Sequence, residues 1–473
     1  MAYDTVFIKC GTQGESYENG PEDVDIATSL DLLVGAKCHH LARELRIDVH
    51  FQADPLPGFK AAISRLREVC DEWVGVRKLS IGLHLEKWVP HYRGPRVANH
   101  EADIASIGSD LAALLPGVRE ICIGGHKQLE ATCVMLGRLV GLYSHQLQVL
   151  HSKHALAMPQ DRVFNQLRDV SIGNALSDEL EHQLPRLDPE VIESLVLGRF
   201  MPDEVWSMFC ADPDCHETTF PRLTDLSVTF CPSFPNPESP WALQFPAAKR
   251  VCIESYDPNC LSMANAVFPA CLESLEVSAG LGLLRAFASA RVRVTQGLAI
   301  YEVSDPDHND DMFGIINSIF DAAGPCRLTN LYVGGVDPVP LDLFTYTGLT
   351  HLSLSMLTSV GDVMSHIRTQ PRLVSLEIDY LSLADIQADF SIPDNADHEP
   401  VAPLDTQLRE LTIYVGHGPE PAELAYAMLK YLLLKIPTLS LVTTGGVSQQ
   451  PIQDFIDEYA QWYPHLANIK LEN

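Results

Sequence analysis

A chain of 473 residues, 46% of them hydrophobic, can bury a large core, and average domain size would predict roughly two to four globular units. The formal net charge of −29, from 33 basic and 62 acidic residues, argues against nucleic acid or an anionic membrane as the main partner. No secretory signal opens the chain, and the most apolar helical run, 425–436, is too short to span a bilayer. We therefore expect a soluble protein, cytoplasmic or else nuclear.

The first forty residues are expected to form a cap. Residues 5–10 read as a short strand, and residues 24–34 as a helix. We assign 1–40 to this N-terminal strand and helix cap. The remaining chain, 41–473, carries a repeating pattern that predicts a solenoid.

The repeat motif is clearest at residues 349–354, which have the form Leu-x-x-Leu-x-Leu. Side chains alternate between the two faces of a strand, so the second and third leucines point inward together. Apolar variants of the pattern recur at 45–49, 76–81, 118–123, 167–172, 192–197, 223–228, 248–253, 272–277, 328–333, 373–378, 408–413 and 466–471, with weaker copies at 147–150, 298–303 and 436–441. This is the pattern of leucine-rich repeats.

Spacing and intervening helices define the fold class. Leu331 and Leu352 lie 21 positions apart, and Leu352 and Leu376 lie 24 apart, within the leucine-rich range of roughly 20–29. Helices are expected at 58–73, 104–115, 310–323, 421–436 and 451–463, and exposed loops at 88–99 and 391–406. We predict an α/β fold: an irregular leucine-rich-repeat-like solenoid (horseshoe) with a parallel concave sheet and helices on the convex side.

One feature of the standard repeat is missing. An asparagine normally follows the strand and bonds the backbone at the turn, but among the equivalent places here only Cys231 fits the Asn/Cys rule. The turns must be closed in another way, and we expect irregular curvature.

A family resemblance lies in three segments, 41–47 (LARELRI), 76–81 (VRKLSI) and 220–226 (FPRLTDL). Together with the degenerate repeats and the acidic balance, they resemble fungal F-box proteins with leucine-rich-like repeats. The resemblance implies a helical F-box that docks on a cullin-type ubiquitin ligase and a solenoid that receives the substrate. No Leu-Pro-type F-box motif precedes the first repeat here. We therefore expect a ubiquitin-ligase adaptor as partner only if an F-box is supplied elsewhere, and a repeat-only adaptor outside the ubiquitin pathway is an alternative.

Clusters with catalytic or metal-binding residue types are incomplete. Cys210, Cys215 and His216 lack a fourth zinc ligand at standard spacing, and 305–311 lacks the Gly and Glu of a calcium loop and is expected to cap a helix. The twelve cysteines form no Cys-x-x-Cys pair, which is typical of free thiols in a reducing compartment. We predict no cofactor, no metal and no enzymatic activity. The alternative is an enzyme or metal-binding protein with its site in inserted loops at 210–216 or 91–100.

The candidate binding surface is the outward strand face that should line the concave side. Acidic residues dominate it, with tyrosines between them, so a basic protein or peptide is the expected partner. The candidate binding residues are Asp225, Glu254, Glu276, Tyr332, His351, Glu377, Asp379, Glu410 and Tyr414, with Glu120 and Asp169 on the same predicted face. The alternative interpretation is that these charges only keep an exposed sheet in solution.

Overall fold

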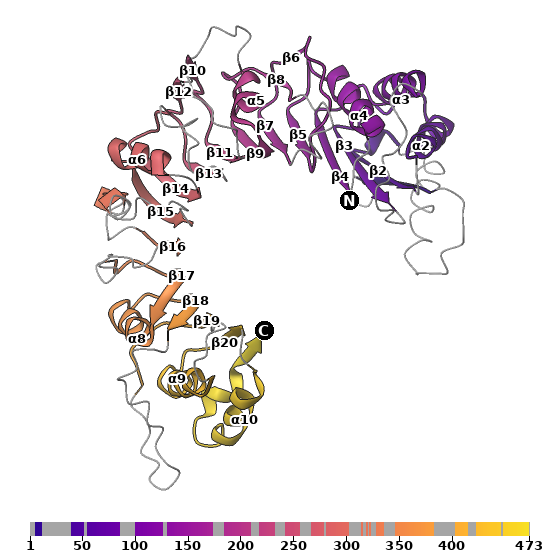
Figure 1. Ribbon diagram of the computed structural model, residues 1–473. Coiled ribbons are helices and arrows are strands. Elements are labelled where there is room, and N and C mark those ends of the chain that lie inside the picture. Colours follow the sequence, from indigo (N-terminus) through magenta and orange to yellow (C-terminus); the bar gives the residue numbers. More distant parts are fainter. Residues whose placement is uncertain are drawn as a thin grey trace. The chain divides into compact units, whose positions relative to one another are not determined.

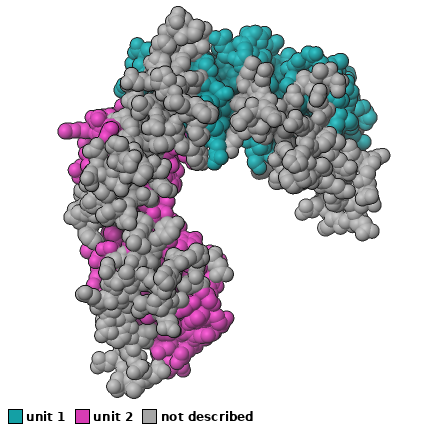
Figure 2. Space-filling view, in the orientation of Figure 1, with its two compact units in different colours: residues 1–248, 265–267 teal, residues 249–264, 268–473 magenta. Residues whose placement is uncertain are grey.

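The computed structural model divides into two compact units. Unit 1 comprises 1–248 and 265–267, and unit 2 comprises 249–264 and 268–473 (Figure 2). The structure describes residues 5–11, 39–51, 54–85, 100–125, 130–173, 184–209, 217–231, 242–255, 266–278, 281–301, 314–315, 318–319, 321–322, 328–334, 346–382, 403–414, 422–445 and 448–472.

Unit 1 is built on a parallel sheet whose strands pair in the order of the sequence (Figure 1). These strands are β1 (Thr5–Gly11), β2 (Glu44–Phe51), β3 (Lys78–Leu85), β4 (Glu120–Gly125), β5 (Val149–Ser152), β7 (Asp169–Ile172), β9 (Ser194–Phe200) and β11 (Asp225–Phe230). Two small parallel pairs accompany them, β6 (Val163–Phe164) with β8 (Arg186–Leu187) and β10 (Glu217–Thr219) with β12 (Ala242–Gln244).

Helices connect the early strands of unit 1. Its helical elements are η1 (His39–Leu41), α2 (Leu56–Val69), α3 (Glu101–Leu114), α4 (Glu130–Leu142) and α5 (Pro202–Ser207). The helix α2 contacts β2 and α3, and α3 contacts α4, so the helices follow one another along one side of the sheet (Figure 1). Phe59, Ile63 and Leu66 of α2 are buried on the face that covers the strands.

Unit 2 repeats this construction. Its parallel strands are β13 (Arg250–Ser255), β14 (Cys271–Ser278), β15 (Arg293–Ile300), β16 (Asn330–Gly334), β17 (His351–Ser359), β18 (Ser375–Ser382), β19 (Glu410–Tyr414), β20 (Leu441–Gly445) and β21 (Lys470–Glu472), each paired with the next. Its helical elements are α6 (Leu281–Ala290), α8 (Val360–Thr369), α9 (Ala422–Lys435), α10 (Gln450–Tyr459) and η4 (Pro464–Asn468). Residues 314–315, 318–319 and 321–322 are also helical.

The strand register places the repeated leucines side by side. Leu331 pairs with Leu352, and Leu352 with Leu376. All three are at most 3% exposed, because period-two alternation turns them toward the helices. Stacking equivalent leucines on adjacent strands builds one continuous apolar row, and this row is the core of the unit.

The α/β class and the parallel sheet predicted from the repeats are confirmed. Every strong and weak copy of the pattern coincides with a strand or its entry, and every strand pairing among the described residues is parallel. No described helix combines the length and apolar character needed to cross a membrane. The expected helix at 24–34, the loops at 88–99 and 391–402, and the clusters at 210–216 and 305–311 lie outside the described residues, and the cap assigned to 1–40 stays a prediction.

A backbone ladder at the strand entries closes the turns that precede the strands, at the opposite end from the place of the missing asparagine. The Arg43 carbonyl accepts hydrogen bonds from the N–H groups of Arg77 (2.8 Å) and Lys78 (3.1 Å), and the Arg77 carbonyl accepts from Arg119 and Glu120. The Arg77 guanidinium then donates to the carbonyl of Gly117 at 3.0 Å. Each repeat is therefore tied to the next before its strand begins.

Candidate functional site

The outward face of the unit 2 sheet carries a row of side chains that the register aligns. Glu276, Ala299, Tyr332, Ser353 and Glu377 are successive partners across β14 to β18. We call these five residues the acidic row. Each lies on the face opposite the buried leucines, so its side chain faces away from the helices.

The carboxylates at both ends of the acidic row are held by neutral hydroxyl groups. The Ser353 hydroxyl donates to Glu377 Oε2 at 3.0 Å. The Tyr301 hydroxyl hydrogen-bonds Glu276, and burial, the Glu276 charge and this hydrogen bond together raise the pKa of Tyr301. Tyr301 therefore stays protonated at neutral pH and keeps donating to Glu276. Both carboxylates are oriented by hydroxyl groups, and neither forms an ion pair with a described basic side chain.

Two aromatic rings stand beside Glu276. The ring centroids of Tyr301 and Tyr332 are 4.4 Å apart with planes tilted by 33°. The ring of Tyr332 lies along its own strand toward Gly334, where an added Cβ would come within 2.8 Å of the Tyr332 hydroxyl. Aromatic faces next to carboxylates suit a cationic side chain, which gains both charge attraction and cation–π contact.

A hollow of about 340 Å³ lies in the same face. Gly297 and Ala299 of β15 leave it open because their side chains are small. Glu276, Tyr332 and Glu377 line it together with residues of the neighbouring row. The volume is enough for one long side chain to enter, and we call this feature the strand-face hollow.

The neighbouring row is polar and holds one carboxylate. It runs through Asn330, His351, Ser375 and Glu410 on adjacent strands. His351 is exposed, and its Nδ1 lies 2.9 Å from the Thr350 hydroxyl. This row therefore adds polar groups beside the acidic row and one further carboxylate at Glu410.

The remaining predicted residues of unit 2 extend the same face. Glu254 is the last residue but one of β13, Asp379 follows Glu377 by two positions on β18, and Tyr414 ends β19. Tyr414 is 39% exposed, and its ring covers Gly445 on the next strand, where a Cβ would overlap it. These residues widen the acidic surface beyond the hollow.

Asp225, Glu120 and Asp169 belong to unit 1, on β11, β4 and β7. The strand face of unit 1 carries basic side chains beside some of its carboxylates. Glu44 pairs with Lys78 at 3.1 Å and Asp48 with Arg46 at 3.1 Å, and Asp169 lies 3.1 Å from a ring nitrogen of His151. The eleven predicted residues therefore do not have uniform surroundings, and among the described residues Glu276 and Glu377 of unit 2 form no ion pair.

Tyr301 and the two small residues of β15 were missed by sequence reasoning. The motif at 298–303 is weak, and its predicted register did not show that the strand begins at Arg293. Period-two alternation from Leu298 and Ile300 would have placed Gly297, Ala299 and Tyr301 on the outward face. The small side chains in that series were the available signal for a hollow.

The arrangement is suited to binding. Among the described residues, no group of three or more His, Cys, Asp or Glu side chains could hold a metal ion. Carboxylates held by hydroxyls, two tyrosine rings and a hollow are chemically suited to a positively charged group.

Comparison of the chain with protein-family models finds no match, and neither does comparison with curated proteins. The resemblance to fungal F-box proteins therefore stays a prediction.

Proposed function

We propose that the chain is an irregular leucine-rich-repeat-like solenoid that acts as a non-enzymatic protein-interaction scaffold. Its binding surface is the acidic strand face of unit 2, and its ligand is a basic segment of another protein. The main support for the proposal is the acidic row. Tyr301 orients Glu276, and Ser353 orients Glu377. Neither carboxylate has a basic neighbour within the row.

The geometry of the row sets the size of the ligand. Four strand spacings of about 4.8 Å separate Glu276 from Glu377, or about 19 Å along the row. An extended peptide covers that length with about six residues. A segment with two basic residues at such a spacing would reach both carboxylates, with one of its side chains in the strand-face hollow.

The role of substrate receptor in a ubiquitin ligase extends this proposal. It rests on the resemblance to fungal F-box proteins and requires an F-box supplied elsewhere. An adaptor outside the ubiquitin pathway would use the same strand face, so the binding test below applies to both versions.

The test is a charge reversal with a matched control. Fluorescence anisotropy measures the affinity of a labelled oligolysine peptide for the native protein, for the double variant Glu276→Lys/Glu377→Lys, and for Asp457→Lys/Glu458→Lys on α10. Both variants change the net charge equally, which matters because the whole chain carries −29. We expect the row variant to weaken binding by about tenfold or more and the α10 variant by about twofold or less.

Equal losses in both variants would mean that the peptide senses only the total charge, and the proposed site would be wrong. A retained melting temperature in the row variant shows that the loss is not unfolding. Replacing Tyr332 by Ala gives an uncharged second probe, and we expect it to weaken binding by about threefold or more through lost cation–π contact.

A further inference from the structure

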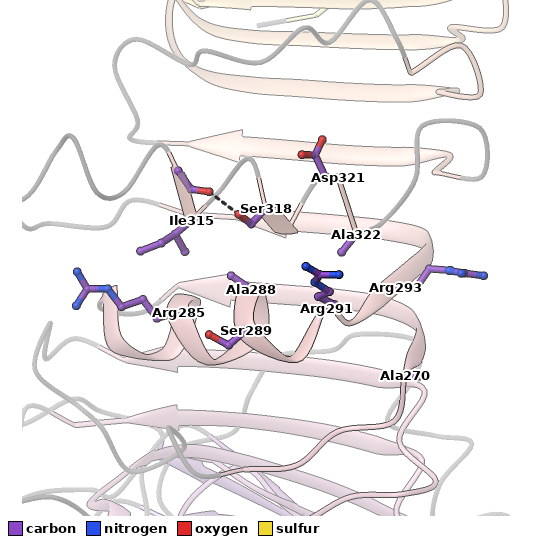
Figure 3. Close-up of a pocket in the computed structure, with 11 residues that line it drawn as sticks. Ala270, Arg285, Ala288, Ser289, Arg291, Arg293, Ile315, Ser318, Asp321 and Ala322 are labelled. Carbon is purple, nitrogen blue, oxygen red and sulfur yellow. Dashed lines mark hydrogen bonds between the residues drawn. The ribbon is translucent and has the colours of Figure 1, made fainter.

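A cavity of about 1010 Å³ lies between α6 and the helical residues 314–315, 318–319 and 321–322 in unit 2 (Figure 3). The helical residues that border it are mostly small. Ala288 and Ser289 contribute from α6, and Gly314, Ser318 and Ala322 from the helical residues that follow it. The Ser318 hydroxyl is turned back to the Gly314 carbonyl at 2.7 Å. Packed helices normally fill such a space with interlocking side chains, so small residues on both sides leave it open.

Charged side chains at this cavity are mainly basic, in a chain with almost twice as many acidic as basic residues. Arg285, Arg291 and Arg293 line it, and Asp321 is its one acidic lining residue among those described. Figure 3 shows Arg291 between the two helices, with Arg285 toward one end and Arg293 toward the other. Among the described residues, no ion pair engages the guanidinium of Arg291 or Arg293.

The backbone at Arg291 supports a role for its side chain. Arg291 follows the last residue of α6 with φ of 48°, the left-handed conformation that glycine adopts at helix ends without cost. It is the only described residue other than glycine with positive φ. A basic residue at a helix C-terminus does gain from the helix dipole, but that gain needs neither positive φ nor a position in a cavity. The strained position carries a guanidinium where glycine would be more stable.

We propose that this cavity is a binding site for a small polyanion that carries phosphate groups. Arginine forms paired hydrogen bonds with phosphate oxygens, and three guanidiniums around a volume of this size suit a ligand with more than one phosphate. The site lies on the helix side of the sheet and is independent of the acidic strand face, so it adds a second ligand of opposite charge.

Titration calorimetry with sodium tripolyphosphate tests this proposal on the full chain. The variants are Arg291→Gly, which removes the guanidinium and relieves the backbone, and Arg293→Gln, with Arg372→Gln outside the cavity as the matched control. We expect binding by the native protein and the control, and at least about tenfold weaker binding by both cavity variants. Citrate, titrated in parallel, distinguishes phosphate from carboxylate recognition. We expect it to bind at least about tenfold more weakly, because it carries less negative charge at neutral pH than tripolyphosphate.

The glycine variant separates binding from folding. Its melting temperature without ligand is expected to equal or exceed that of the native protein, because glycine removes the positive-φ strain. Addition of tripolyphosphate should raise the melting temperature of the native protein and raise that of Arg291→Gly by less at the same concentration. The proposal is overturned if the native protein does not bind tripolyphosphate, if both cavity variants bind it within twofold of the native protein, or if citrate binds equally well.

Discussion

His366 is a buried histidine of α8, with 4% of its surface exposed. Burial lowers its pKa from the ordinary value of 6.5, and the charge of Asp362 opposes this shift only in part. In the folded protein His366 therefore stays neutral over a pH range in which the unfolded chain already takes up a proton.

This difference predicts a loss of stability in acid. The pKa of His366 is lower in the folded protein than its value of 6.5 in the unfolded chain. Its contribution to the free energy of unfolding is therefore fully present above pH 6.5 and falls as the pH drops below that value. At pH 5 the loss in free energy of unfolding is at most about 2 kcal/mol, because each pH unit below 6.5 lowers it by at most about 1.4 kcal/mol. Urea unfolding of the native protein and His366→Gln at pH 7.5 and pH 5 measures it. The variant should lose less stability than the native protein, and equal losses would contradict the account.

At the scale of the element, the connection between consecutive strands of unit 1 depends on a close backbone approach. A Cβ on Gly117 would lie 2.7 Å from Arg77 Nη1 and 3.0 Å from the carbonyl oxygens of Val74 and Val76. Two of these three neighbours are backbone atoms that cannot move independently. Glycine at this position therefore permits the contact through which Arg77 closes the turn.

We expect Gly117→Ala to lower the free energy of unfolding by about 1–3 kcal/mol through overpacking. Gly124 on β4 is the matched control, because no atom lies within 4 Å of the position its Cβ would take. The change Gly124→Ala should be neutral or slightly stabilising, since alanine restricts the unfolded chain. Chemical denaturation of both variants checks this, and a similar loss at the two glycines would count against the turn mechanism.

Strands were the elements best predicted from the sequence, because their core positions carry two inward leucines at a fixed spacing. Leu352 and Leu354 identify β17, and their partners on β16 and β18 follow from the same pattern. The helices α4, α6 and α8 were not predicted. The sequence of α6, LGLLRAFASA, shows why, because its apolar residues do not follow regular helical spacing. Turn closure by Arg77 depends on contacts 40 residues apart, which a local pattern does not reveal.

At the scale of the whole molecule, charge is distributed unequally between equivalent faces. The strand face of unit 1 places Lys78 beside Glu44 and Arg46 beside Asp48. The strand face of unit 2 leaves Glu276 and Glu377 oriented by hydroxyl groups. Net charge read from the sequence could not locate this difference, because it depends on which strands become neighbours. It makes unit 2 the place where a basic partner should bind.

Site-specific photocrosslinking tests whether a basic ligand binds at the strand face of unit 2. A benzophenone amino acid replaces His351 on the strand face of unit 2 or, as the control, Gln453 on the exposed side of α10. Both proteins are irradiated with labelled oligolysine peptide. We expect a crosslink from position 351 that excess unlabelled peptide suppresses, and little or none from position 453. Equal crosslinking at both positions, or crosslinking at 453 only, would contradict binding at the acidic strand face.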